Sequence, residues 1–111
     1  MSKVNKRQYV NTVVGTEVVS LGADAYKLEC IVIPYPDATT KTAIPFTVDL
    51  GYLSYAIGNG TYLLSYGGNS DYRFVLNATV TAYTRNVSLN NVTWSGTDIT
   101  STAKLVVASV S

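Results

Sequence analysis

The chain has 111 residues, of which 47% are hydrophobic and 14% are charged, and its formal net charge is +1. This length fits one domain with a single core, and the apolar content excludes an intrinsically disordered chain. A surface so poor in charge often lies against another protein.

Residues 1–8 form a basic N-terminal arm that contains Lys3, Lys6 and Arg7, three of the eight positive charges. The remaining residues 9–111 form the predicted domain and carry more acidic than basic groups. General nucleic-acid binding needs basic groups spread over a folded face, so we expect no nucleic-acid partner. The arm is interpreted either as a solvated terminus or as a tether to an acidic neighbouring protein.

The same N-terminal segment lacks the apolar run of a signal peptide, and no stretch of the chain has the apolar length that would span a membrane. Cys30 is the single cysteine, so an internal disulfide is excluded. We therefore expect assembly in a reducing cytoplasm and no membrane partner. Sequons at Asn59, Asn77, Asn86 and Asn91 are expected by chance in a chain so rich in Asn, Thr and Ser.

Valine, threonine and tyrosine dominate runs of period two, which predicts short antiparallel strands separated by Gly, Pro, Asn and Asp clusters. Residues 9–14 and 16–21 are expected to pair as a hairpin around Gly15. The next strand, residues 26–33, places Tyr26, Leu28, Cys30 and Val32 on its apolar side. The strand over residues 44–50 carries Pro45 near its start, which favours an edge position.

Residues 51–72 contain five of the nine tyrosines and an Asn59-Gly60 dipeptide, the strongest short signal for a hairpin turn. A hairpin centred on this turn has one apolar face, made of Leu53, Tyr55, Ile57, Tyr62, Leu64 and Tyr66, with Tyr52 at the end of the other face. The first interpretation of these tyrosines is packing. Contact with another subunit and a sugar-binding platform are the alternatives.

The clearest alternation, in residues 72–84, directs six side chains inward: Tyr72, Phe74, Leu76, Ala78, Val80 and Ala82. A further break is expected around residues 86–91. The last strand, residues 104–110, is apolar on both sides, which predicts cover by a second layer or by a neighbouring subunit. Together these segments predict an all-β, single-domain antiparallel β-sandwich or jelly-roll-like barrel of about seven or eight strands, without a helix.

Reactive side chains are scarce. Histidine is absent, which excludes Ser-His-Asp and Cys-His catalysis, and the seven carboxylates show no spacing typical of a glycosidase or metal site. Cys30 lies on an apolar strand face, so we expect a buried, inert thiol. The segment GGNSD, residues 67–71, predicts a tight turn. We expect no catalytic residue, cofactor or metal ligand; an enzyme that uses facing carboxylates alone is the third hypothesis.

The basic segment MSKVNKRQYV, the Val/Thr/Tyr strand runs and the lack of catalytic residues together resemble the small all-β virion proteins of tailed bacteriophages, especially capsid decoration or cement proteins. The resemblance implies a non-enzymatic virion protein that forms a homo-oligomer, with a trimer favoured, and docks on the major capsid protein to stabilise the shell. The alternative function is a carbohydrate- or receptor-binding module, such as a fibre tip, that uses surface tyrosines. The residues expected at partner contacts are Lys3, Lys6, Arg7, Tyr9, Tyr52, Tyr55, Tyr62 and Tyr66.

Overall fold

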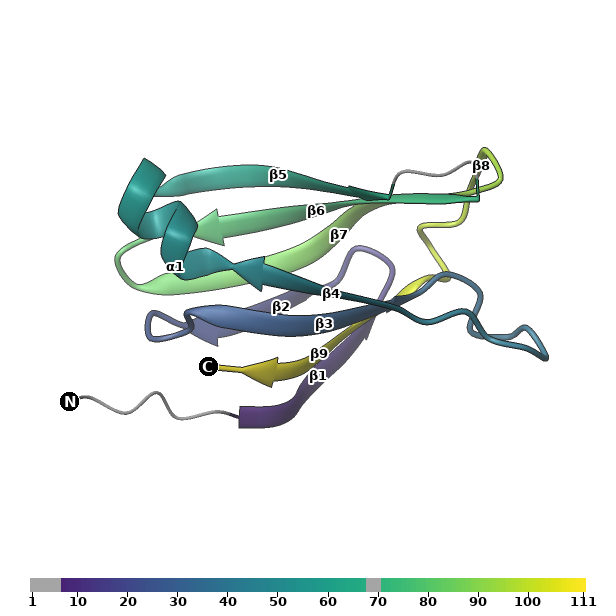
Figure 1. The fold of residues 1–111 in the computed structure, drawn as a ribbon, viewed down its shortest axis with the longest axis horizontal. Coiled ribbons are helices and arrows are strands. Elements are labelled where there is room, and N and C mark those ends of the chain that lie inside the picture. The colour runs from purple at the N-terminus through teal and green to yellow at the C-terminus, as the bar shows by residue number, and fades with distance from the viewer. Residues whose placement is uncertain (1–6, 68–70) are drawn as a thin grey trace.

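Two antiparallel sheets pack against each other in the computed structural model, which describes residues 7–67 and 71–111 (Figure 1). Sheet A has the strand order β1 (Arg7–Val14), β9 (Lys104–Val110), β3 (Lys27–Ile33), β4 (Ile44–Asp49). Sheet B has the order β2 (Val18–Gly22), β7 (Thr84–Trp94), β6 (Tyr72–Val80), β5 (Gly60–Gly67), and the short β8 (Thr97–Asp98) pairs with β7. The predicted antiparallel β-sandwich is confirmed, with nine strands in the described residues.

The core lies between the sheets and is built by the predicted alternation of buried and exposed side chains. In β6, Phe74, Leu76, Ala78 and Val80 are buried, and each has a less buried neighbour on the opposite face. The alternation in β3 buries Leu28, Cys30 and Val32 in the same way. One buried face per strand fixes the register, because a slip by one residue would expose the whole apolar set. Pro45 lies on β4, an edge strand, as predicted.

The C-terminal strand β9 occupies the middle of sheet A, between β1 and β3. Leu105 and Val107 are buried in the core, while Val106 and Ala108 are half-buried on the outer face. Sheet B therefore supplies the second layer predicted for one side of this strand. The other side forms the apolar middle of the outer face of sheet A.

The predicted hairpin of residues 9–14 with residues 16–21 is wrong. β1 pairs with β9, and β2 pairs with β7 in the other sheet. Gly15 adopts a φ of +64°, which favours glycine, and its N–H donates to the carbonyl of Ala103 at 2.9 Å. The turn at Gly15 therefore carries the chain from one sheet to the other.

The predicted tyrosine hairpin is also wrong, and so is the expected absence of helix. Residues after β4 form the short helix α1 (Leu50–Tyr52) and the π-helical turn η1 (Leu53–Ile57), and β5 begins only at Gly60. The carboxylate of Asp49 caps this segment by accepting from the Tyr52 N–H at 2.8 Å. The Gly58 N–H closes it on the Leu53 carbonyl at 2.8 Å. This helical connection takes the chain from sheet A to the far edge of sheet B.

Two predicted boundaries in sheet B also differ. β6 ends at Val80, because the Thr81 hydroxyl accepts from the Thr84 N–H at 3.0 Å and starts a tight turn that leaves Ala82 exposed. β7 then continues as a strand through the break expected at residues 86–91, although its register with β6 shifts between Leu89 and Asn91. Of the turn predicted at residues 67–71, residues 68–70 lie outside the described residues.

Replacing Leu105 with alanine should destabilise the protein by about 2–5 kcal/mol, because the side chain is fully buried in the strand that joins β1 to β3. Urea denaturation followed by circular dichroism measures the loss. The matched control is Val106→Ala on the outer face of the same strand, which should cost less than half as much. Equal losses for the two variants would contradict this account of the core.

Candidate interaction surface

Large exposed apolar side chains gather at one end of the sandwich. They come from three connections: the loop between β2 and β3, the α1–η1 segment, and the turn between β6 and β7. We call this surface the aromatic end; its members, with their exposed fractions, are Tyr26 (55%), Tyr52 (59%), Tyr55 (95%), Ile57 (65%) and Tyr83 (86%).

The strand register brings these three connections together. Gly22, which ends β2, pairs with Thr84, which starts β7, so the β2–β3 loop lies beside the β6–β7 turn. Gly60 pairs with Val80, so the end of η1 lies beside the same turn. Figure 1 shows α1 and both connections at the left end of the molecule. Residues far apart in the sequence thus form one surface.

Contacts beneath the exposed rings fix the α1–η1 segment to sheet A. The Gly51 N–H donates to the Tyr26 carbonyl at 3.0 Å, and the Tyr26 N–H donates to the Ser111 carbonyl at 2.7 Å. The Tyr26 ring lies over Gly51 so closely that a Cβ at Gly51 would stand 2.1 Å from its Cε2 atom. Only glycine leaves room for the ring there.

Arg85 connects the β6–β7 turn to the α1–η1 segment. Its guanidinium donates to the carbonyl of Thr81, to the carbonyl of Thr84 at 3.1 Å, and to the Ser54 hydroxyl at 3.5 Å. The side chain is half-buried, and its Nε is a buried atom that has no hydrogen-bond partner. Arg85 therefore holds the β6–β7 turn and η1 in place.

The predicted contact residues divide between several places. Tyr52 and Tyr55 belong to the aromatic end. Lys3 and Lys6 lie outside the described residues, as do the side chains of Arg7 and Tyr9, which are the first and third residues of β1.

Tyr62 and Tyr66 of β5 are half-buried, and Tyr66 packs against the core. The Tyr66 ring stacks on Phe74 with centroids 5.1 Å apart, and its hydroxyl donates to the Thr47 carbonyl at 3.2 Å. Burial, and secondarily Cys30 nearby, raises the pKa of the Tyr66 phenol. The single tyrosine face expected from Tyr55, Tyr62 and Tyr66 is therefore not formed.

Tyr26 and Tyr83 also belong to the aromatic end, although the sequence did not predict them as partner-contact residues. Tyr26 was predicted on the apolar side of its strand, but β3 begins one residue later, at Lys27. Tyr26 therefore lies in the loop that follows β2, where its side chain is exposed. Tyr83 lies in the turn that Thr81 and Thr84 close, a signal that the strand ends before it.

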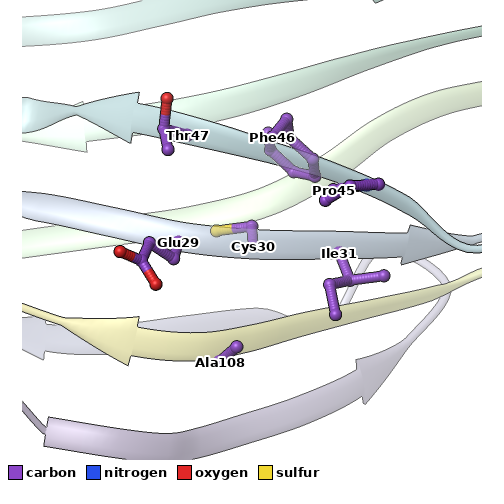
Figure 2. A pocket seen from close by; sticks show the side chains of 7 residues that line it. All are labelled: Glu29, Cys30, Ile31, Pro45, Phe46, Thr47 and Ala108. Carbon is purple, nitrogen blue, oxygen red and sulfur yellow. The ribbon is translucent and has the colours of Figure 1, made fainter.

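Two shallow hollows lie elsewhere on the surface, and each contains one carboxylate. The larger, of about 430 Å³, lies on the outer face of sheet A and is lined by Glu29, Cys30, Ile31, Pro45, Phe46, Thr47 and Ala108 (Figure 2). The smaller, of about 380 Å³, is lined by Thr16, Asp98, Thr100 and Ser101. The hydroxyl and N–H of Thr100 lower the pKa of Asp98. Within the described residues, no three His, Cys, Asp or Glu side chains group to hold a metal ion.

Comparison with known proteins gave no match to a family model, to a curated protein or to a solved structure. In the part of the chain that the structure describes, no helix combines the length and the apolar character needed to cross a bilayer.

Gly51→Ala should destabilise the protein by about 1–3 kcal/mol, because the added methyl group displaces the Tyr26 ring. In a Tyr26→Ala background the same change should cost nothing or stabilise slightly, since alanine favours helix over glycine. The double-mutant cycle is measured by urea denaturation. An identical cost in both backgrounds would show that the ring does not cover Gly51.

The Cys30 thiol should react with a chromogenic disulfide reagent only when the protein unfolds. Burial leaves Cys30 2% exposed and raises its pKa from 9.0 to about 12, so the native protein holds no thiolate at neutral pH. Because the unfolded thiol ionises at its ordinary pKa, the stability that this group contributes is complete below pH 9.0 and falls as the pH rises toward 12. The Cys30→Val variant should not show this part of the decrease in unfolding free energy at alkaline pH, which urea denaturation measures. Rapid labelling under native conditions would contradict the assignment.

Proposed function

We propose that this chain is a non-enzymatic structural virion protein of the capsid decoration type, which docks on the major capsid protein through the aromatic end. The observation that supports this proposal most directly is the gathering of five large exposed apolar side chains on one surface. Exposed apolar groups that occur singly are ordinary, whereas a contiguous group of them marks an interaction site.

Tyrosine suits such a contact. It supplies a large, rigid apolar ring with few rotatable bonds and a hydroxyl that can bond at the rim of an interface. Tyr55 and Tyr83 are almost fully exposed, so each would bury nearly its whole ring against a partner. Arg85 and the Tyr26–Gly51 contact hold the surrounding backbone in place, which lowers the ordering cost of binding.

The N-terminal arm adds electrostatic attraction in this proposal. β1 begins with Arg7 paired to Val110, next to Ser111, whose carbonyl accepts from Tyr26 of the aromatic end. Lys3, Lys6 and Arg7 lie at or before this pairing in the chain. Basic groups there would steer the protein toward an acidic capsid surface and raise its association rate.

The carbohydrate-binding alternative draws less support. It uses Tyr52, Tyr55, Tyr62 or Tyr66 to stack on sugar rings, and an exposed row of coplanar rings would support it. Tyr66 is stacked within the sandwich, and Tyr62 is half-buried with its hydroxyl donating to the Gly58 carbonyl. The irregular, turn-borne aromatic end suits a protein surface better than a row of sugar rings.

The test is reconstitution on virions from the organism that encodes the chain. Particles purified on a density gradient should contain the protein, and particles from a strain lacking its gene should rebind the recombinant chain. A Tyr55→Ser/Tyr83→Ser variant should bind at least about tenfold more weakly, because it removes two anchoring rings from the interface.

The matched control is Val18→Ser, which removes an exposed apolar side chain (53%) from β2, at the opposite end of the β2–β7 register from Thr84. It should bind like the wild-type protein. Particles that never contain the chain, or a double variant that binds unchanged, would refute the proposed docking.

A further inference from the structure

Besides the two-residue β8, the described part of the sandwich has four edge strands, and three of these four carry features that discourage pairing with another chain. β4 contains Pro45, and its Thr47 carbonyl accepts from the Tyr66 hydroxyl. β1 is distorted by an irregularity between Gln8 and Asn11, and β2 has only five residues. Proline, bulges and short length are the usual means by which natural sheets protect their edges.

The fourth edge strand, β5, has none of these features. Its sequence GTYLLSYG contains no charged residue and no proline, and its eight residues pair with β6 without a register shift. Figure 1 shows β5 as the outermost strand of sheet B. Leu63, in the middle of the strand, is 67% exposed on the outer face. A long, regular, uncharged edge with an exposed leucine at its centre is suited to receiving another strand.

We propose that β5 of one copy pairs antiparallel with β5 of a second copy, which joins the two B sheets across a two-fold axis. In an antiparallel pair, opposite residues point to the same face, so outward residues must face outward residues. Placing the axis at Leu63 meets this condition. Leu63 then faces its own symmetry mate, Thr61 faces Ser65, and Tyr62 faces Leu64 on the inner side.

The charge distribution fits self-pairing. Because β5 carries no charge, a two-fold pair brings no like charges into direct opposition. The nearest described guanidinium belongs to Arg73 on β6, opposite Gly67, and donates to the Ser65 hydroxyl at 3.4 Å. The antiparallel arrangement places the two Arg73 side chains at opposite ends of the contact, where they do not repel each other strongly.

If the aromatic end docks on a capsid as proposed above, the β5 pairing gives the protein two docking surfaces. Only this step of the inference rests on the proposed function. β5 begins at Gly60, with two residues between it and the end of η1, so the aromatic end lies at the start of this strand. Antiparallel pairing therefore directs the two aromatic ends in opposite directions. The assembly is a two-fold dimer instead of the trimer that the resemblance to decoration proteins implies.

Light scattering and sedimentation equilibrium of the purified full-length chain test the pairing. The wild-type protein should have about twice the 11.9 kDa chain mass at high micromolar concentration. Leu63→Lys places two cations beside each other at the axis and should give monomers. Leu63→Glu should also be monomeric, and an equimolar mixture of the two variants should restore the dimer through the opposite charges.

The matched control is Val18→Lys, which introduces the same charge at an exposed position (53%) on β2, the other edge of sheet B, and should leave the dimer intact. Circular dichroism verifies that each variant is folded. A monomeric or trimeric wild-type protein, a dimeric Leu63→Lys variant, or a mixture that stays monomeric would overturn the proposal. None of these results bears on virion docking, which the Tyr55→Ser/Tyr83→Ser variant tests separately.

Discussion

The structure depends on the insertion of the C-terminal strand β9 between β1 and β3. Without β9, β1 would have no partner in sheet A, because it pairs with nothing else there. The last residue continues this role: the Ser111 carbonyl accepts from the N–H groups of Tyr26 and Lys27, and its own N–H donates to the Lys27 carbonyl at 2.9 Å. Closing a loop of nearly the whole chain carries an entropic cost that only cooperative burial can offset. We therefore expect sheet A, the core and the hydrogen bond between Tyr26 and Ser111 to form together during folding.

This topology also explains where the exposed aromatic residues lie. Several connections carry the chain from one sheet to the other, and the α1–η1 segment and the β2–β3 loop do so at the same end of the sandwich. Residues in such connections are free of the alternation that buries every second side chain of a strand. Tyr52, Tyr55 and Tyr26 can therefore face solvent, although chemically similar rings at Tyr66 and Phe74 pack inside.

The sequence predicted those features that depend on local alternation. β3 and β6 bury most of the expected residues, such as Cys30 and Leu76, because one-sided burial fixes both strand and register, whereas Tyr26 and Ala82 lie beyond the strand ends. The choice of strand partners was not predictable in this way, since Val13 and Val19 are buried equally well whether β1 and β2 pair with each other or in separate sheets. In residues 50–57 the apolar spacing fits a strand and a helix alike, and the Asp49 cap decides between them. Tyr52 and Tyr55 of the aromatic end were predicted as contact residues. Tyr26 and Tyr83 were not, because only the fold brings their connections to the same end of the sandwich as Tyr55.

The two proposed contacts differ in physical kind, and salt should separate them. Pairing of β5 edges depends on backbone hydrogen bonds and on leucine contact in a strand without charges, so added salt has little to screen. Docking assisted by Lys3, Lys6 and Arg7 depends on attraction that is largely screened beyond about 8 Å at physiological ionic strength. The two contacts use different parts of the chain, the basic residues at the N-terminus and the middle of β5, so one contact can weaken without the other. We therefore expect the dimer to persist in high salt, whereas the rate of association with virions should fall.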